Sequence, residues 1–534
     1  MKLSTVPRLQ SPSPSPERRH CIADLVFDIG GSLACYFPLR PPETRVNSPH
    51  VIQKAMEWFQ ECRESHARCI EHNNAHSFVP TRLLEVGAGS AARIYLRDME
   101  ISAESNCDYA ALSYCWGGPQ PRMTTVANLE EHMTRGIPVG DLPATIQDAI
   151  SVARCLRLPY LWIDVLCIIQ DDDADKAREL GRMGKVYRTA TITICASTAK
   201  AVSEGFLSSP RQPPEVMQKR LHLSDEIHGT IGWAFICRVN NGFDHPLDVR
   251  AWTMQEYFLS PRRLVYSKYE LIWDCYTIGP RTLTTSHLMY TFSISEDART
   301  LCGASADTVA AMTPWAKSLS WREMLGEYTM RSMTFSADRL NAVLGIANEI
   351  CTLWGDSHLF GLLRSDVILQ LAWKVEEPTR DVRSERGPSW AWVSTTDSGW
   401  VQFIKEDTEE KTMKPDACFT GVADDDQRRL FLEARLAEAD EVKFPMVMVE
   451  PLDDGDKNLY PDLKKYSRME SDRLLLLGRA QVEYNTGLSD VALVVREVET
   501  GTYRRQGFVY FTHDLAGYDR SVWDKYGQQK VTLI

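Results

Sequence analysis

The 534-residue sequence lacks several patterns that would assign it to a class at once. Its 14 cysteines have no repeating spacing, so a disulfide framework like that of small secreted domains is not expected. The N-terminus has no basic stretch followed by an apolar one, as a secretory signal has. The most apolar early segment, residues 21–37, is too short to cross a bilayer and is interrupted by Asp24 and Asp28. We therefore expect a soluble protein with reduced thiols, in the cytoplasm or alternatively the nucleus.

An excess of positive charge is also missing. The 60 Lys and Arg residues are outnumbered by 72 Asp and Glu residues, and the formal net charge is -12. A net-acidic surface repels nucleic acids and anionic membranes at long range, so we expect no nucleic-acid partner and no membrane span. The composition, 44% hydrophobic and 25% charged, is that of a globular protein with two or three domains.

The chain contains no internal repeat, and shifts in composition divide it into five segments. A Ser-Pro run at residues 11–16 cannot form a helix or a strand ladder, which indicates a flexible leader. The expected order is a leader (1–48), a helix and β-hairpin (49–100), an α/β domain (101–270), a mainly helical region (271–380) and a β-rich C-terminal region (381–534).

Apolar residues recur at helical spacing over residues 51–69 and predict an amphipathic helix. One face of that helix carries three residues that could ligate zinc: Cys62, His66 and Cys69. A fourth ligand such as Cys21 or Cys35 would be needed. The spacing matches no strong zinc pattern, so simple packing is the favoured interpretation, and we expect no metal and no cofactor.

A glycine-rich turn around Gly87 and Gly89 imitates a nucleotide or S-adenosylmethionine loop. A phosphate-binding loop should open a helix, whereas residues 93–96 look extended. The pattern therefore favours a β-hairpin over residues 81–96, and a methyltransferase remains the weaker alternative.

The pattern over residues 109–196 alternates strand and helix and predicts a parallel sheet with right-handed crossovers. The first helix starts at Pro143, and the second is expected to be capped by Asp173 or Asp175. Its inward-facing residues should be Leu180, Met183, Val186 and Tyr187. The three expected strands are residues 109–114, 160–163 and 191–195.

Ligands bind outside the carboxyl ends of the strands in such sheets, and two of these strands run directly into polar loops. The residues expected to line the cleft are Ser113, Tyr114, Trp116, Gly117, Asp164, Cys167, Gln170 and Asp171. Trp116 could stack on a base and Gly117 could allow close approach, although Trp116 and Trp162 could equally be core aromatics. Asp164 ends a buried strand, so it must be paired or face a wet cleft. Cys167 is more simply a buried, inert thiol than a nucleophile, because the only nearby histidine is His132.

Five ordered sequence boxes resemble the fungal heterokaryon incompatibility (HET) domain family. Residues 109–256 are the most specific part of the resemblance. Two departures are Val165, where the family usually has a small residue, and Lys176, where a Trp is common. The boxes are residues 112–117, residues 142–149, residues 160–172, the set Glu179, Met183 and Tyr187, and residues 250–256.

The resemblance implies a role in fungal non-self recognition and programmed cell death. The HET domain has been likened to TIR domains, some of which cleave NAD, so the fold implied is TIR-like, with a flavodoxin-like parallel sheet and flanking helices. Glu179 has a position like that of the TIR catalytic glutamate, where it could stabilise the ribosyl cation of NAD, a substrate rather than a cofactor. The alternative is that Glu179 is a carboxylate on the solvent face of its helix.

The box at residues 250–256 could close one wall of the cleft, although Trp252 and Met254 suit packing. Its polar members and Trp252 are expected to lie behind the residues that touch substrate: Arg250, Trp252, Gln255 and Glu256. If the domain is an NAD glycohydrolase, self-association could gate it. The second hypothesis is a non-catalytic signalling module that works through self-association or another incompatibility protein.

Overall fold

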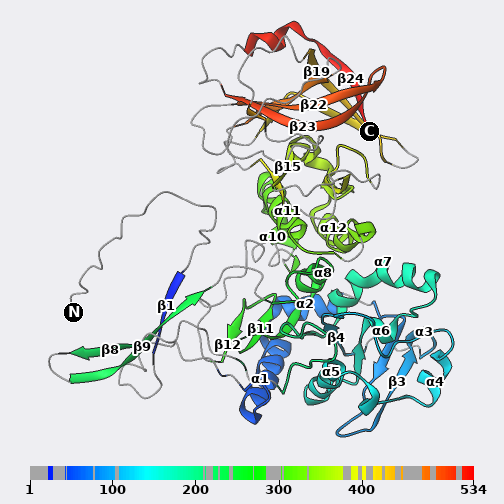
Figure 1. The fold of residues 1–534 in the computed structure, drawn as a ribbon, viewed down its shortest axis with the longest axis vertical. Helices are drawn as coiled ribbons and strands as arrows, with labels where there is room; N and C mark the ends of the chain where they lie inside the picture. The colour runs from blue at the N-terminus through cyan, green and yellow to red at the C-terminus, as the bar shows by residue number, and fades with distance from the viewer. Residues whose placement is uncertain are drawn as a thin grey trace.

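The computed structural model describes most of the chain, with gaps between the described ranges. Figure 1 shows a sheet flanked by helices at one end of the long axis, a helical region in the middle and β strands at the other end. None of the helices in the described ranges is both long and apolar enough to cross a membrane. The described residues are 22–27, 43, 45–75, 78–102, 107–208, 211, 220–225, 229–239, 245–268, 270–283, 302–303, 306–333, 336–376, 387–394, 400–404, 413–423, 427–438, 447–448, 472–480, 489–512 and 520–534.

A nine-stranded mixed sheet organises the first half of the chain. Its centre consists of four parallel strands in the order β6-β4-β7-β10, and antiparallel strands extend it on both sides. The predicted α/β class and the parallel strands are therefore confirmed. The strands across the sheet are β12 (Arg281–Thr282), β11 (Leu271–Cys275), β10 (Arg262–Tyr266), β7 (Ile192–Cys195), β4 (Tyr109–Ser113), β6 (Tyr160–Trp162), β2 (Arg82–Glu85), β3 (Arg93–Asp98) and β5 (Ile137–Pro138).

Two crossover helices connect the parallel strands and lie on opposite sides of them in Figure 1. Helix α5 (Ala144–Cys155) leads from β4 to β6, and α7 (Asp173–Thr189) leads from β6 to β7, after the short helix α6 (Asp164–Cys167). Because β4 and β7 are buried along their whole length, apolar residues fill nearly every position in both strands.

Two details of α7 differ from the sequence-based expectation. Its N-cap is Asp172, whose side chain accepts hydrogen bonds from the backbone N–H groups of Ala174 and Asp175, so the prediction of Asp173 or Asp175 was wrong by one to three positions. Leu180 is 39% exposed instead of facing inward. It lies about 100° around the helix from Glu179, which takes the inward position.

The N-terminal segment forms two helices where one was predicted. Helix α1 (Pro49–Ser65) stops at His66, whose backbone is extended, and α2 (Ala67–Ala75) follows in a new direction. The hairpin expected next is confirmed, because β2 and β3 pair antiparallel around the Gly87 turn. This turn joins two strands and opens no helix, which removes the structural basis for a methyltransferase. Two further short helices are α3 (Met99–Ser102) and α4 (Leu129–Thr134).

The middle of the molecule is helical, as Figure 1 shows. Helix α8 (Thr253–Leu259) and α12 (Asn341–Trp354) both pack on α7, which joins this region to the sheet. Short β pairs flank the helices: β13 (His358–Leu359) with β14 (Leu362–Leu363), and β15 (Trp373–Glu376) with β16 (Trp400–Phe403). The remaining helices are α10 (Ala306–Ala310), α11 (Pro314–Thr329) and α13 (Val367–Gln370).

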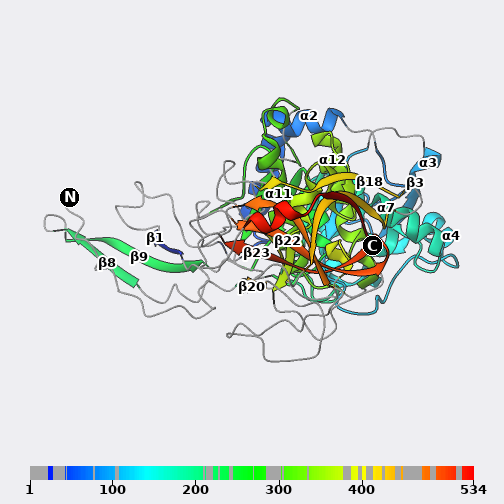
Figure 2. The same ribbon diagram turned by 90° about the horizontal axis from the view of Figure 1, so that it is seen from above.

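The C-terminal region is β-rich. Strand β19 pairs with both β24 and β21, so five strands, β21-β22-β23-β24-β19, form a closed ring. Figures 1 and 2 also show a separate small sheet to one side of the main body, made of β1 (Ile22–Phe27), β9 (Gly229–Val239) and β8 (Arg220–Asp225). Strand β1 falls inside the expected leader, whereas the Ser-Pro run lies outside the described residues. The C-terminal strands are β17 (Lys414–Pro415), β18 (Cys418–Val422), β19 (Leu430–Glu438), β20 (Val447–Met448), β21 (Asp472–Ala480), β22 (Ser489–Glu499), β23 (Thr502–Thr512) and β24 (Gln528–Leu533).

The sheet contains a buried and an exposed ion pair, and these should differ in their contribution to stability. Arg263 and Asp274 lie directly opposite each other on β10 and β11 and are both buried. Replacing Asp274 with Ala leaves a buried guanidinium without this carboxylate, so we expect a loss of about 3–5 kcal/mol in the free energy of unfolding.

The control is Glu85→Ala, which removes the exposed pair with Arg97 on β2 and β3, where the side chains are 41% and 44% exposed. We expect this change to cost less than about 1 kcal/mol in urea-induced unfolding. Equal losses for the two variants would show that burial does not govern the strength of these pairs.

Candidate functional site

The candidate site lies at the carboxyl edge of the parallel strands, around the carboxylate of Asp164. The Tyr114 hydroxyl donates to one oxygen of Asp164 at 2.9 Å, and the Trp116 indole N–H donates to the other at 2.9 Å. The backbone N–H of Val165 adds a third donor at 2.7 Å. Asp164 is only partly buried. Desolvation nevertheless raises its pKa, and the three donors act in the opposite direction. The carboxylate is thus fixed in place within a partly exposed residue.

Glu256 of α8 is a second carboxylate at this edge. Its side chain is 6% exposed, and desolvation raises its pKa to about 7. The Ser113 and Tyr187 hydroxyls and the charge of Arg250 favour the ionised form, whereas the charge of Asp164 opposes it. Oxygen Oε2 of Glu256 is buried and accepts no hydrogen bond from the described residues. Glu256 therefore titrates near neutral pH, which is characteristic of acid–base residues in active sites.

Arg250 links α8 to the loop after β4. Its guanidinium donates to the backbone carbonyl of Tyr114 at 3.1 Å, close to both carboxylates. From the sequence, Arg250 and Glu256 are expected behind the residues that touch substrate. The structure brings both next to Ser113, Tyr114 and Asp164, so they belong to the same cluster.

Glu179 makes a different set of contacts. It is 1% exposed, so the alternative that it lies on the solvent face of α7 is wrong. Its oxygen Oε1 accepts a hydrogen bond from the Thr81 hydroxyl at 2.8 Å and pairs with Arg178 at 3.2 Å. The hydrogen bond from Thr81 holds α7 against the start of β2.

Helix α6 separates the Glu179 contacts from the Asp164 cluster. Asp164, at its first position, faces Tyr114 and Trp116, whereas the carbonyl of Cys167, at its last position, accepts a hydrogen bond from Arg82 at 2.8 Å. Arg82 also pairs with Asp175, which is buried in the first turn of α7. Arg82 and Thr81 were missed in the sequence. The available signal was a charged residue at the head of a buried strand.

Four other residues expected in the cleft make packing contacts or hydrogen bonds within the chain. Gly117 packs against Ala201. Gln170 donates to the backbone carbonyl of Asp164 at 3.1 Å, and Asp171 accepts from the backbone N–H of Val126 at 2.8 Å. Cys167 is buried, and desolvation raises the pKa of its thiol to about 12, which fits the inert thiol favoured by the sequence.

Of the remaining aromatic and amide residues expected near the cleft, one lies beside Asp164 and the others pack in the core. Trp162 is fully buried and packs edge-on against Tyr187, so it is a core residue, whereas Trp116 is partly exposed beside Asp164. Trp252 is partly buried and packs against the core. Gln255 is buried and donates to the Asn341 carbonyl at 3.1 Å, which ties α8 to α12.

This arrangement defines an α/β domain with a cluster of carboxylates at the carboxyl edge of its parallel strands. Residues 109–256 match the family model described as Heterokaryon incompatibility protein (HET). The match runs from the first residue of β4 to Glu256, so this part of the chain is similar to HET domains. Neither the curated proteins nor the solved structures gave a match to this chain.

Gly117 should be far less tolerant of alanine than another glycine with the same backbone conformation. Its φ is +70°, and an added Cβ would lie 2.3 Å from the Ala201 Cβ and 2.4 Å from its Cα. Gly89 has φ +62° and nothing within 4 Å. Both alanine variants incur left-handed backbone strain, so we expect Gly117→Ala to cost about 1–3 kcal/mol more through overpacking. Urea unfolding of the two variants measures this, and equal losses would contradict it.

The raised pKa of Glu256 should make stability depend on pH. Between the ordinary value of 4.5 and about 7, the folded state holds a proton that the unfolded state releases. The free energy of unfolding therefore falls as pH rises through this window, by up to roughly 3 kcal/mol from this residue. Glu256→Gln removes this contribution. The stability difference between wild type and variant, from urea unfolding at several pH values, should change across the window. A constant difference would show that Glu256 does not titrate there.

Proposed function

We propose that the chain acts in fungal non-self recognition and programmed cell death by hydrolysing the N-glycosidic bond of NAD or a related nucleotide. The observation that carries this proposal is the presence of two neighbouring acidic residues at this edge: Asp164, which is partly exposed, and Glu256, which is buried and has a pKa of about 7. Two carboxylates whose different environments give them different pKa values often serve as the acid and the base of an active site.

The sheet order supports a flavodoxin-like, TIR-like reading of the domain. In chain order the parallel strands β4, β6, β7 and β10 are first to fourth, and their spatial order is second, first, third, fourth. This is the order of flavodoxin-like sheets, in which ligands bind where the connections from the first strand diverge. Ser113 and Tyr114 lie at that point, at the end of β4.

In the proposed reaction the bond between ribose C1′ and the nicotinamide nitrogen breaks, and its electron pair neutralises the pyridinium. Asp164 stabilises the positive charge that develops on the ribose. A water molecule then attacks C1′ and gives its proton to Glu256, whose pKa suits a base at neutral pH. The products are nicotinamide, ADP-ribose and a proton. The partly exposed ring of Trp116 offers a stacking surface for a base.

Glu179 is the carboxylate that the resemblance to TIR domains implies for the catalytic role. To reach a substrate it would have to leave Thr81 and Arg178. We therefore assign the chemistry to Asp164 and Glu256, and we assign Glu179 the role of positioning α7 against β2. The two assignments predict different variant behaviour.

The test is nicotinamide release from NAD by the purified full-length protein, at concentrations that allow self-association. We expect Asp164→Asn and Glu256→Gln each to lower the rate at least about 100-fold, since positioned acid–base groups contribute about 10²–10⁴-fold. Glu179→Gln should retain most of the activity, and so should the control Glu130→Gln, which alters an exposed carboxylate on α4. Circular dichroism confirms that each variant is folded.

Each alternative has its own outcome. Loss of release in Glu179→Gln alone would move the catalytic role to the residue implied by the resemblance. If folded wild-type protein leaves NAD and related nucleotides intact at all concentrations, the enzymatic proposal fails. The non-catalytic signalling module, acting through self-association or a partner, would then be the function to pursue.

A further inference from the structure

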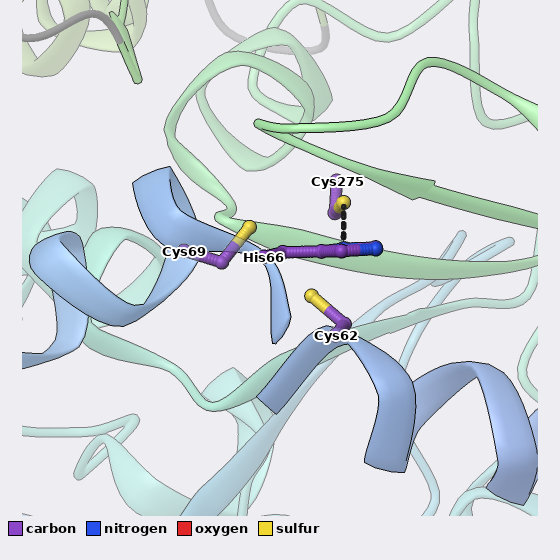
Figure 3. A group of neighbouring side chains, drawn as sticks. All are labelled: Cys62, His66, Cys69 and Cys275. Atoms are coloured by element: carbon purple, nitrogen blue, oxygen red, sulfur yellow. Dashed lines mark hydrogen bonds between the residues drawn. The ribbon is translucent and has the colours of Figure 1, made fainter. Parts of the chain in front are cut away.

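Four potential metal ligands lie together at the edge of the sheet opposite the carboxyl edge that carries the candidate site. Figure 3 shows three cysteine sulfurs gathered around one imidazole ring. One ligand atom from each residue lies within 4.8 Å of every other, and all four side chains are buried. The residues are Cys62, His66, Cys69 and Cys275.

The chain forms this cluster by breaking a helix. Cys62 lies in the last turn of α1, His66 is the extended residue at its end, and Cys69 lies in α2. The change of direction at His66 lets all three converge. The fourth member, Cys275, is the last residue of β11 and is 209 positions from His66 in sequence. The sequence-based candidates for a fourth ligand, Cys21 and Cys35, lie outside the described residues.

We propose that these four residues bind a structural zinc ion. Three cysteines and one histidine are a standard ligand set for tetrahedral zinc. With Zn–S bonds of about 2.3 Å, tetrahedral ligands are separated by roughly 3.8 Å. The ligand atoms of the cluster lie within 4.8 Å of one another, so their separations exceed those around a bound zinc ion by about 1 Å at most. Four protein ligands leave no open position for substrate, which is typical of a structural site.

Two of the sulfurs accept hydrogen bonds from donors next to the cluster. The buried guanidinium of Arg262 donates through Nε to the Cys62 sulfur at 3.1 Å, and also to the Cys69 carbonyl at 3.2 Å. The backbone N–H of Ile278 donates to the Cys275 sulfur at 3.3 Å. Three thiolates and Zn²⁺ have a net charge of −1, which the neighbouring guanidinium balances.

The two nitrogens of His66 have different neighbours. Nδ1 lies 3.4 Å from the Cys275 sulfur, inside the cluster, whereas Nε2 lies 3.6 Å from a carboxylate oxygen of Glu61. A ligating histidine usually directs its second nitrogen to a carboxylate, which fixes the ring and its tautomer. Glu61 is itself held by Arg281 of β12 at 2.9 Å. Zinc would therefore be bound through Nδ1.

A zinc ion here would connect α1 and α2 to β11. It would close a loop of about 200 residues, and long loops gain most in principle from such a cross-link. Simple packing of reduced thiols, which the sequence favoured, does not require an arginine and a backbone N–H directed at two of the sulfurs. This proposal does not depend on the proposed function, because the cluster shares no residue with the Asp164 site.

The test measures metal in full-length protein purified without a polyhistidine tag and exposed to zinc before gel filtration. Elemental analysis should find about one zinc per chain in the wild type. Cys275→Ser should lose it, and the control Cys351→Ser, which alters a buried free cysteine on α12, should retain it. Folded wild-type protein without stoichiometric zinc would overturn the proposal, and so would iron in its place or full retention by Cys275→Ser.

A second measurement, made on the wild type, tests the site even if the variants fail to fold. X-ray absorption at the zinc edge of the wild type should show three sulfur ligands at about 2.3 Å and one nitrogen at about 2.0 Å. A first shell without sulfur would mean zinc bound elsewhere and would overturn the site. His66→Cys should keep the metal, because four thiolates also suit zinc, whereas His66→Ala should weaken it. A chelator should lower the melting temperature of the wild type and of Cys351→Ser alike.

Discussion

Burial of the parallel strands on both faces is the constraint on which the rest of this domain depends. Helices cover β4 and β7 so fully that every polar group at the strand ends must find a partner inside the protein or keep access to water. Asp164, Asp175 and Glu256 meet this constraint in three ways. Asp175 pairs with Arg82, Asp164 accepts hydrogen bonds from neutral donors, and Glu256 keeps one oxygen without a donor among the described residues. Only the last arrangement gives a pKa near 7, because Glu256 has fewer hydrogen-bond and charge partners to offset its desolvation.

Local patterns in the sequence were sufficient to predict the strand and helix alternation of residues 109–196, the β2–β3 hairpin and the need of Asp164 for hydrogen-bond partners. Each depends on periodicity or on turn chemistry within about ten residues. The N-cap of α7 is harder to predict from the sequence, because Asp172, Asp173 and Asp175 can all cap a helix equally well. The conformation of the preceding loop determines that Asp172 takes this position.

Long-range packing decided what the sequence could not show. The pKa of Glu256 depends on how α8 packs against β4, and the burial of Glu179 depends on Thr81 from the N-terminal hairpin. Cys275 is 209 positions away from His66, so no local spacing could join it to Cys62 and Cys69. A helix break at His66 was also invisible, since apolar periodicity continues across it.

The outermost strands of the nine-stranded sheet, β12 and β5, are each only two residues long. An edge of that length offers very few free backbone groups to a strand from another molecule. The closed ring of the C-terminal region likewise leaves its five strands paired on both sides. Neither the nine-stranded sheet nor the closed ring therefore offers a long free edge among the described residues, so the open-ended sheet extension that produces fibres has little to start from in either of them.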